Sequence, residues 1–548
     1  MAIFSAVTIT YILRWIFVIL SVMIVFECIY SLLSSKHAPE ILGYFNIVDG
    51  EKIPITHWEN VIGRSKSSDI KISSDSISNT HALLIKRDKG WFIKDLNSNN
   101  GTYINGKSVK KSNITDEDDI RLGEVISTII PENQNLVFKN PISQRRIAFQ
   151  ITIFQILTII QLLISTDLKI FSLLPIVILS VIMWVYITKF NKTKSTGFEI
   201  ELIAFYLTTL NLAIIASSDP GRLKTEFIAI IIGISLMIFM CNYMKDIKKS
   251  QKLKPLLIVL SVIAFIINVL FGSVQNGAAN WLELGSLSLQ PSEFVKIAFI
   301  FLGADTLENL YNQKNNLSYT IFAIFCLGCL AYISDFGTAL IFLAVYLVIS
   351  FLRSGDFSRM IFSLGGIAAV GLMVLKFKPY IATRFAVWGH AWQPEFINDA
   401  GFQQTRTMSY GAGGGLLGIG AGNGSLKYLE AANTDLVFGC VMEEWGLIIA
   451  ILIVLCIGAF ALFAYTHILS GHSTFYTLLA CGTSTLFIVQ TMLNVFGSVD
   501  VLPLTGVTFP FVSAGGSSMI ASWAMLAYLK MCDSRNIDKK IIKEEEAE

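Results

Sequence analysis

Charged residues are scarce in this sequence. Asp, Glu, Lys and Arg together make up 15% of its 548 residues, whereas hydrophobic residues make up 53%. A water-soluble domain needs more charge than this to cover its surface, so the composition excludes a wholly soluble protein. It predicts that most of the chain lies in lipid as apolar helices.

Thiol and metal chemistry have little support. The eight cysteines are scattered, and the pair Cys326 and Cys329 falls inside an apolar run, which argues against a redox or metal role. His390 has no second histidine near it in sequence, so it does not suggest a metal site. The first apolar run, residues 7–33, is too long for a signal-peptide core and lacks a convincing cleavage site, so we expect a retained anchor.

The chain divides into one polar segment and a series of apolar ones. Residues 41–140 are rich in polar residues, short β-branched runs and turn pairs such as Asn105-Gly106, which predict a small all-β sandwich. Apolar segments of nearly bilayer length predict about thirteen membrane-spanning helices, one before the sandwich and the others after it. The expected fold is therefore a polytopic α-helical membrane protein with an inserted β-domain. Its predicted parts are an anchor at 1–36, the β-domain at 41–140, two further helices at 145–190, a core of ten helices at 197–531 with a large loop at 378–435, and a tail at 532–548.

Lysine and arginine set the predicted orientation. The short loops 189–194, 245–254 and 353–359 and the tail 530–543 are basic, and counting helices puts all of them on one side. The positive-inside rule makes this side cytoplasmic. The same count places the β-domain and the C-terminus inside and the large loop outside.

Polar residues of the β-domain form an ordered series of motifs. They are Gly63-Arg64-Ser65, Ser78-Asn79-Thr80-His81, Asn99-Asn100-Gly101-Thr102 and Asn105-Gly106. An arginine is a natural fork for a phosphate dianion, and serine and asparagine side chains on loops add neutral hydrogen bonds. The series resembles the forkhead-associated (FHA) domain, a β-sandwich that binds phosphothreonine peptides. The resemblance implies that Arg64 and Ser78 hold the phosphate and that Asn79, Asn99 and Asn100 hold the peptide.

A second set of motifs lies in segments predicted to face outward. Pro291 suits the first turn of a helix, and Glu293 and Lys296 share one face of that helix, where they can neutralise each other. The segment 388–445 is the longest polar interruption in the apolar C-terminal half, and it includes a glycine-dense run at 411–424. Membrane proteins often carry their chemistry in such loops, so we expect the functional site here.

The motifs continue in order through the core. They include Gln290-Pro291-Ser292-Glu293, Asp335-Phe336-Gly337-Thr338, Gly401-Phe402-Gln403, Thr434-Asp435-Leu436, Glu443-Glu444-Trp445-Gly446 and Gly515-Gly516-Ser517-Ser518. Together they resemble the SEDS family (shape, elongation, division and sporulation), which includes FtsW, RodA and SpoVE, over residues 198–530. The resemblance implies a peptidoglycan glycosyltransferase that polymerises lipid II outside the bacterial cytoplasmic membrane during division, elongation or sporulation. It also implies a transpeptidase partner, a class B penicillin-binding protein.

The reaction needs a carboxylate that accepts a proton from the attacking sugar hydroxyl, and cationic groups that stabilise the departing lipid diphosphate. The family places a catalytic aspartate six residues before the position of Phe402, where this chain has Phe396. Asp399 and Glu395 flank that position and are the candidate catalytic residues. The sequence makes no cofactor certain and leaves a divalent cation, Mg²⁺ or Mn²⁺, open. The residues expected to bind substrate are Glu293, Lys296, Asp335, Arg384, Arg406 and Asp435.

Other functions stay open at this point. A catalytically divergent family member would act as a scaffold that recruits a phosphorylated cytoplasmic protein to the cell-wall machinery. Transport of lipid II across the bilayer rests only on the many helices and some buried polar residues. The β-domain, if it has not lost its ligand, implies a phosphothreonine protein and its serine/threonine kinase in the same cell. The expected partners are thus lipid II, membrane lipid, the transpeptidase and the phosphoprotein, and not nucleic acid.

Overall fold

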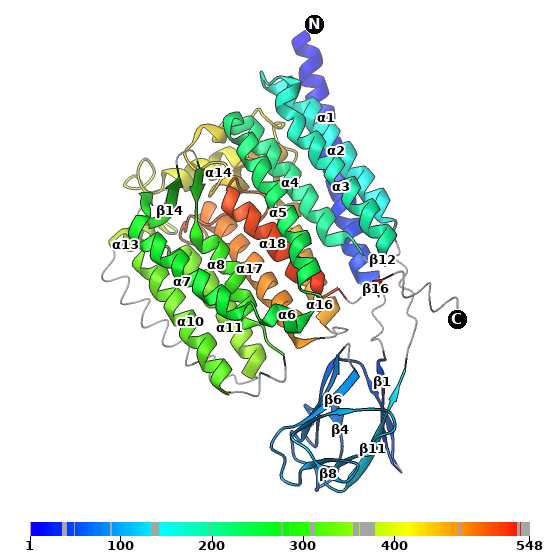
Figure 1. Ribbon diagram of the computed structural model, residues 1–548. Coiled ribbons are helices and arrows are strands. Elements are labelled where there is room, and N and C mark those ends of the chain that lie inside the picture. Colours follow the sequence, from blue (N-terminus) through cyan, green and yellow to red (C-terminus); the bar gives the residue numbers. More distant parts are fainter. Residues whose placement is uncertain are drawn as a thin grey trace.

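In the computed structural model, a helical bundle carries a β-domain at one end (Figure 1). Apolar length predicts a helix over residues 360–377. Most of that segment and the tail beyond residue 538 lie outside the described residues. The residues that the structure describes are 2–34, 41–48, 50–87, 90–132, 142–195, 197–275, 278–284, 287–306, 309, 313–354, 361, 379–468, 473–533 and 537–538.

The β-domain is a sandwich of two sheets, as predicted, with its hydrophobic core between them. One sheet has the strand order β2-β1-β11-β10-β7-β8 and the other β4-β3-β5-β6-β9. Phe45, Leu84 and Ile120 are fully buried in the core. Asn105 and Gly106 connect β7 to β8 with φ angles of 48° and 79°, the left-handed conformation that a tight hairpin turn requires. The strands are β1 (Gly43–Ile47), β2 (Lys52–Ile55), β3 (Glu59–Gly63), β4 (Ile70–Lys71), β5 (Ala82–Arg87), β6 (Gly90–Asp95), β7 (Thr102–Ile104), β8 (Lys107–Ser108), β9 (Lys111–Ile114), β10 (Ile120–Leu122) and β11 (Val125–Pro131).

Apolar helices form the bundle. Among the described residues, nine helices are long and apolar enough to cross a membrane. Three further helices among the described residues, α8, α10 and α18, are shorter or only partly apolar. The helices of the bundle are α1 (Ala2–Ser34), α2 (Gln144–Ser165), α3 (Leu174–Thr193), α4 (Glu199–Ser218), α5 (Leu223–Tyr243), α6 (Ile247–Gln251), α7 (Lys254–Phe271), α8 (Pro291–Gly303), α10 (Gln313–Tyr332), α11 (Phe336–Ser354), α13 (Pro379–Val387), α14 (Phe402–Gly414), α15 (Val437–Trp445), α16 (Leu447–Ile468), α17 (Thr474–Ser498) and α18 (Gly516–Met531).

Apolar length predicts a single span over residues 436–465, but the structure has two helices there. α15 ends at Trp445 and α16 begins at Leu447, and Gly446 between them has a φ of 89°. Only glycine adopts this conformation without strain, and an added Cβ would lie 2.4 Å from the carbonyl oxygen of Leu416. The break therefore lets the glycine-dense run pack directly against the end of α15.

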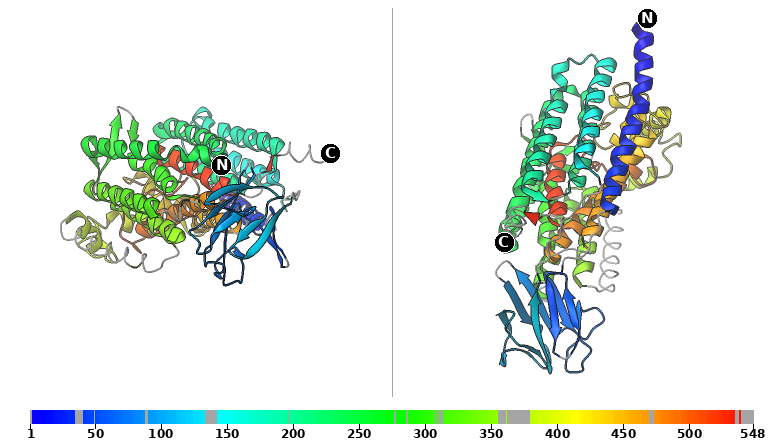
Figure 2. Two further views of the ribbon diagram at one scale, coloured as in Figure 1. Left: turned by 60° about the horizontal axis from the view of Figure 1, so that its bottom comes forward. Right: turned by 90° about the vertical axis from the view of Figure 1, so that its right-hand side faces the viewer.

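The three N-terminal helices pack against the rest of the bundle (Figures 1 and 2). α1 contacts α2, α4 and α16, and α2 also contacts α4. Ser31 of α1 and Gln144 of α2 both donate hydrogen bonds to the Glu199 carboxylate of α4, at 2.7 and 3.1 Å. Buried hydrogen bonds of this kind join helices in lipid, where apolar burial alone gives little preference for association.

The connections at the bundle end away from the β-domain form a layer of their own. Strands β13 (Ser273–Gln275), β14 (Ala278–Leu284) and β15 (Leu287–Leu289) make a small antiparallel sheet, and α14 lies at the same end (Figure 1). Asp335 caps α11 there, because its carboxylate accepts a hydrogen bond from the backbone N–H of Thr338 at 3.1 Å. This end of the bundle carries the polar residues singled out by the sequence.

Candidate functional site

Three predicted substrate-binding residues, Asp335, Arg384 and Asp435, lie close together at the bundle end away from the β-domain. Asp435 lies beside Gly506, where an added Cβ would be 3.4 Å from its carboxylate. Arg384 of α13 donates a hydrogen bond to the carbonyl oxygen of Leu504 in the same loop. Burial raises the pKa of Asp435 to about 6; the positive charge of Arg384 opposes this rise and the negative charge of Asp335 adds to it. Two carboxylates and one guanidinium therefore act on one another here.

Asp335 is held by donors from three segments. Its carboxylate accepts hydrogen bonds from the side-chain amides of Asn280 and Gln290 at 3.1 and 3.2 Å, besides the bond from Thr338. The backbone N–H of Gln290 in turn donates to the Ser517 hydroxyl at 3.2 Å. Asp335 thus ties the small sheet and the starts of α8, α11 and α18 into one polar region.

A buried ion pair continues this region into the bundle. Lys296 Nζ donates to Glu293 Oε1 at 2.7 Å and to Gln490 Oε1 at 3.4 Å, and the lysine is only 1% exposed. The Gln490 amide donates to Thr508 at 2.9 Å. A buried ion pair is costly unless its remaining hydrogen-bonding capacity is met, and Gln490 meets part of it here.

The two predicted catalytic carboxylates lie in a separate, exposed segment. Residues 388–401 form a series of turns, and Glu395 and Asp399 are both exposed on it. Asp500 fixes this segment by accepting hydrogen bonds from the backbone N–H groups of Gly389 and Ala391. Within the described part of the chain, no side-chain hydrogen bond or ion pair of Glu395 or Asp399 is present. The structure therefore does not bring either of them into contact with the Asp335–Arg384–Asp435 cluster.

Arg406, the remaining predicted substrate-binding residue, contacts a residue of its own helix. It is on α14, where its guanidinium is 5.1 Å from the centre of the Phe402 ring. This is a cation–π contact between residues four apart on one helix face.

Glu443 and Glu444, for which the sequence predicts no role, lie under the glycine-dense run. Both are buried at the end of α15. Glu443 accepts hydrogen bonds from the backbone N–H groups of Ser425 and Leu426 at 2.8 Å, and Glu444 accepts one from Gly422 at 3.0 Å. The sequence signal that could have identified them is a pair of adjacent acidic residues shortly before a glycine that ends the helix. The glycines thus let the backbone approach the protein's own helices.

The same run is held from the other side by the N-terminal helices. Ser165 of α2 donates to the carbonyl oxygen of Ala421 at 2.6 Å, and Gln161 donates to the same oxygen at 3.4 Å. Arg14 of α1 donates to the carbonyl oxygen of Ile419. We call residues 415–424 the glycine turn and these contacts from α1 and α2 the clasp.

The residues predicted to bind phosphothreonine lie on neighbouring loops of the β-domain. The Ser78 hydroxyl accepts a hydrogen bond from the backbone N–H of Asn99 at 3.0 Å, and the Asn100 amide donates to the carbonyl oxygen of Ser76 at 2.7 Å. Asn79 is exposed beside them and shields Gly63, where an added Cβ would lie 2.1 Å from the Asn79 carbonyl oxygen.

Arg64 is not free in this state of the domain. Its guanidinium donates to the Asp75 carboxylate at 2.6 Å, and both side chains are well exposed. Asp75 therefore occupies part of the guanidinium fork of Arg64, the side chain predicted to hold a phosphate. Sequence analysis did not single out Asp75, because an acidic residue in a polar loop gives no distinctive pattern.

A metal ion has limited support from the protein side chains. Among the described residues, no group of three or more His, Cys, Asp or Glu side chains is placed to hold one. Asp335 and Asp435 offer two carboxylates. Mg²⁺ is commonly bound by one or two carboxylates together with substrate phosphates, so these residues fit a cation that arrives with a diphosphate.

Two family models match this chain. The model described as "Cell cycle protein", which groups FtsW, RodA and SpoVE, matches residues 198–536, and the FHA domain model matches residues 60–123. The first match covers more than half of the chain, and α1, α2 and α3 lie outside both matches.

Curated relatives carry one recurring name. The chain is 27% identical to "Probable peptidoglycan glycosyltransferase FtsW" of Bacillus subtilis over 58% of its own length and 82% of that protein. It is 30% identical to the protein of the same name from Escherichia coli O6:H1, over 53% of its own length and 72% of the relative. A solved chain from a study of the "structural coordination of polymerization and crosslinking by a peptidoglycan synthase complex" is similar in fold. Its TM-score is 0.51 at 22% identity, over 62% of this chain and 97% of that one.

Proposed function

The chain belongs to the family of FtsW, RodA and SpoVE, and from this premise we propose that it is a peptidoglycan glycosyltransferase that polymerises lipid II. It is a multi-pass protein of the bacterial cytoplasmic membrane with an FHA domain at its N-terminal side. We place the FHA domain in the cytoplasm and the Asp335–Arg384–Asp435 cluster at the outer face, on the strength of the basic loops. That cluster is the observation that carries the proposal.

The cationic groups suit the departing diphosphate. Arg384 lies at the outer cluster, and Lys296 lies in the polar region that continues from it into the bundle. Positive charge held by surrounding hydrogen bonds stabilises negative charge that develops on a leaving group. Asp335 and Asp435 keep this charge in place, and with a divalent cation they would hold the diphosphate itself.

The proton from the attacking sugar hydroxyl has to go to a carboxylate. In the proposed step the hydroxyl oxygen bonds to the donor sugar carbon while the bond from that carbon to the diphosphate breaks, and the diphosphate leaves with the electron pair. Asp399 and Glu395 are exposed, so an incoming hydroxyl can reach them, whereas the Asp335 carboxylate is already held by three donors. We assign the general base to one of these two exposed residues.

Regulation is the role that we propose for the FHA domain. A phosphothreonine protein would bind at Arg64, Ser78, Asn79, Asn99 and Asn100, replacing Asp75 on the arginine. The β-domain is inserted between α1 and α2, the two helices that make the clasp on the glycine turn. Binding inside would therefore reach the outer face through these helices. A class B transpeptidase is the proposed partner on the outer side.

The test is polymerisation of lipid II by the purified full-length protein, with and without a transpeptidase partner, in the presence and absence of Mg²⁺ or Mn²⁺. Asp399→Ala and Glu395→Ala are compared with Asn398→Ala, a matched change at an exposed neighbouring residue without a carboxylate. We expect one of the two acidic variants to lose roughly 10²–10⁴-fold in rate, the usual contribution of a general base. Asn398→Ala should stay close to the wild type.

Two outcomes would contradict the proposal in different ways. Glycan chains of normal length from both acidic variants would move the general base elsewhere. No chains from the wild-type protein, with partner and cation present, would favour the scaffold, for which the exposed and uncoordinated Glu395 and Asp399 are the supporting observation.

A further inference from the structure

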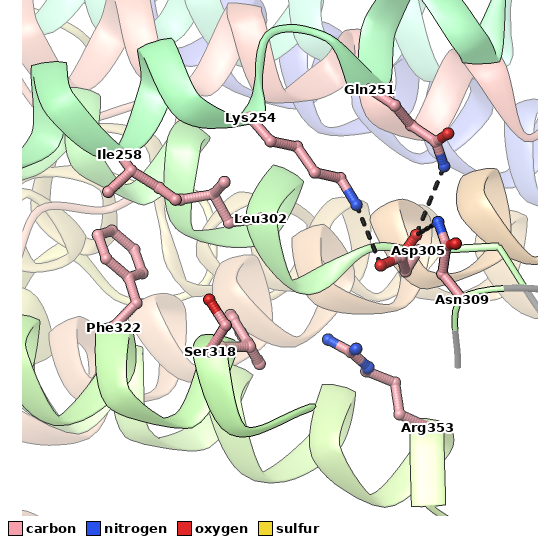
Figure 3. Close-up of a pocket in the computed structure, with 10 residues that line it drawn as sticks. Gln251, Lys254, Ile258, Leu302, Asp305, Asn309, Ser318, Phe322 and Arg353 are labelled. Carbon is pink, nitrogen blue, oxygen red and sulfur yellow. Dashed lines mark hydrogen bonds and ion pairs between the residues drawn. The ribbon is translucent and has the colours of Figure 1, made fainter. Parts of the chain in front are cut away.

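A polar cavity of about 310 Å³ lies in the bundle at the end near the FHA domain, between α7, α8, α10 and α11 (Figure 3). Its position follows from α6, because Gln251 of that helix lines the cavity and Lys248 lies 5.7 Å from the Phe92 ring of the FHA domain. The site is therefore far along the helices from the Asp335–Arg384–Asp435 cluster. No role in glycan polymerisation accounts for it.

Asp305 is the one acidic group among the described residues that line the cavity, and its carboxylate is well supplied with partners. The Asp305 carboxylate forms an ion pair with Lys254 at 3.0 Å and accepts hydrogen bonds from the Asn309 amide at 2.7 Å and the backbone N–H of Thr306 at 3.0 Å. Figure 3 shows Gln251 directed toward the same carboxylate, at 3.4 Å. Asp305 and Lys254 thus form an ion pair, and the remaining charged group among the described lining residues is Arg353, on which Asp305 also acts electrostatically.

Arg353 is a cation with unmet hydrogen-bonding capacity. One of its terminal nitrogens donates to the carbonyl oxygen of Gly303 at 3.2 Å, whereas its Nε and its other terminal nitrogen are shielded from solvent and have no hydrogen-bond partner among the described residues. The Tyr319 hydroxyl beside it is also shielded and has no hydrogen-bond partner in the part of the chain that the structure describes. Leaving charged donors buried and unpaired is costly, so such a group in a membrane protein calls for an anion. A guanidinium fork matches the oxygens of a phosphate.

The apolar part of the lining indicates which kind of molecule would carry a phosphate group into this cavity. Ile258 lies one helical turn deeper in α7 than Lys254, and Phe322 lies one turn deeper in α10 than Ser318. Leu302 of α8 completes this apolar wall. Polar groups at the helix ends with apolar groups one turn further in reproduce the order of headgroup and acyl chain in one leaflet. A free phosphate ion has no apolar group that could pack against this wall, so the wall favours a phosphate that carries acyl chains.

We propose that this cavity binds the headgroup of an anionic phospholipid from the leaflet on the side of the FHA domain, with Arg353 as the phosphate ligand. The acyl chains lie along Ile258 and Phe322. Because α6 contacts both the cavity and the FHA domain, an occupied cavity also fixes the surface on which that domain rests.

The test uses the full-length protein in detergent, with bound lipid measured by native mass spectrometry. Phosphatidylglycerol, phosphatidylcholine and inorganic phosphate are titrated in separate experiments. We expect phosphatidylglycerol to bind at least about tenfold more tightly than phosphatidylcholine. Millimolar inorganic phosphate should not measurably displace bound phosphatidylglycerol. Displacement by phosphate alone would show a site for a soluble anion and would overturn the lipid assignment.

Two variants keep the result interpretable. Arg353→Gln removes the phosphate ligand, and Ser318→Glu places a negative charge in the cavity at an exposed position that the fold tolerates. Both should lower phosphatidylglycerol binding about tenfold or more, whereas Lys249→Gln, an equal loss of positive charge at an exposed position of α6 outside the lining, should not. Wild-type lipid binding by Ser318→Glu and by folded Arg353→Gln would overturn the proposal.

Discussion

At the scale of single residues, protonation of Asp435 is placed to control the candidate site. Its pKa is raised to about 6 by burial, so the carboxyl is charged above about pH 6 and becomes neutral as the pH falls through that value. Protonation removes its attraction for Arg384. The proposed hold on the diphosphate weakens with it.

The polymerisation rate of the wild-type protein should therefore fall below about pH 6, by up to about tenfold per pH unit for one ionising group. Asp435→Asn should be slow at neutral pH and should lack this acidic limb. The matched control is Asp219→Asn, which removes a partly exposed carboxylate paired with Arg222 at 3.0 Å. An acidic limb that is unchanged in Asp435→Asn would assign the ionisation to another group.

Asp75 makes a second prediction at this scale. Because its carboxylate competes with phosphate for Arg64, Asp75→Asn should tighten binding of a phosphothreonine peptide pool, measured by fluorescence anisotropy with the full-length protein. The gain should be modest, roughly two- to fivefold, since an exposed ion pair is weak in water. Asp116→Asn, an equal change of charge at another exposed position of the domain, is the control. Weaker binding by Asp75→Asn would mean that Asp75 orients Arg64 for the ligand.

At the scale of elements, the glycine turn is shaped by what surrounds it. Gly422 has a φ of 84°, and an added Cβ would lie 2.4 Å from the Ser165 hydroxyl oxygen of α2. Gly415 is also left-handed, with a φ of 60°, but an added Cβ there meets no atom within 4 Å. The two positions therefore separate backbone strain from the contact with α2.

Gly422→Ala should lower the thermal unfolding midpoint of the purified protein more than Gly415→Ala does. Backbone strain costs about 1–3 kcal/mol in either variant, and only Gly422→Ala also displaces Ser165. Nearly equal midpoints for the two variants would show that the clasp contributes little to stability. The comparison needs no assay of activity.

The helices differ in how far their sequence predicts them. Pro291 and Asp335 are local signals, and the structure places them at the first turn of α8 and at the cap of α11. The division at Gly446 could not be predicted from apolar length, because both halves are apolar and the break depends on contact with residues 415–418. Such a break is a tertiary effect.

At the scale of the whole molecule, the sequence predicted the separate helices and the β-domain but not the contacts between them. Apolar length and turn pairs identified the spans and the sandwich, because both depend on neighbouring residues. The cluster of Asp335, Arg384 and Asp435 joins three distant segments, so no spacing could predict it. The bond from Ser165 to Ala421 crosses 256 positions and depends on how α2 packs beside the core.

This packing connects the position of the FHA domain in the chain to the outer face. The domain follows α1, which ends at Ser34, and precedes α2, which begins at Gln144, so both of its ends lead into helices of the clasp. In α1, the 21 residues from Arg14 to Ser34 span roughly 30 Å, the thickness of a bilayer core. A shift of the domain on binding a phosphoprotein can therefore be carried across the membrane by two rigid helices.

The prediction is that a phosphothreonine peptide pool changes the polymerisation rate of the wild-type protein by at least about fivefold, the lower end of ordinary coupling between sites. The double variant Gln161→Leu with Ser165→Ala should still bind the pool, measured by anisotropy, but its rate should no longer respond. Thr152→Val is the control, because Thr152 of α2 contacts Trp184 of α3 rather than the glycine turn. A double variant that responds like the wild type would show that the signal does not pass through the clasp, even if the peptide and the enzyme activity are both as proposed.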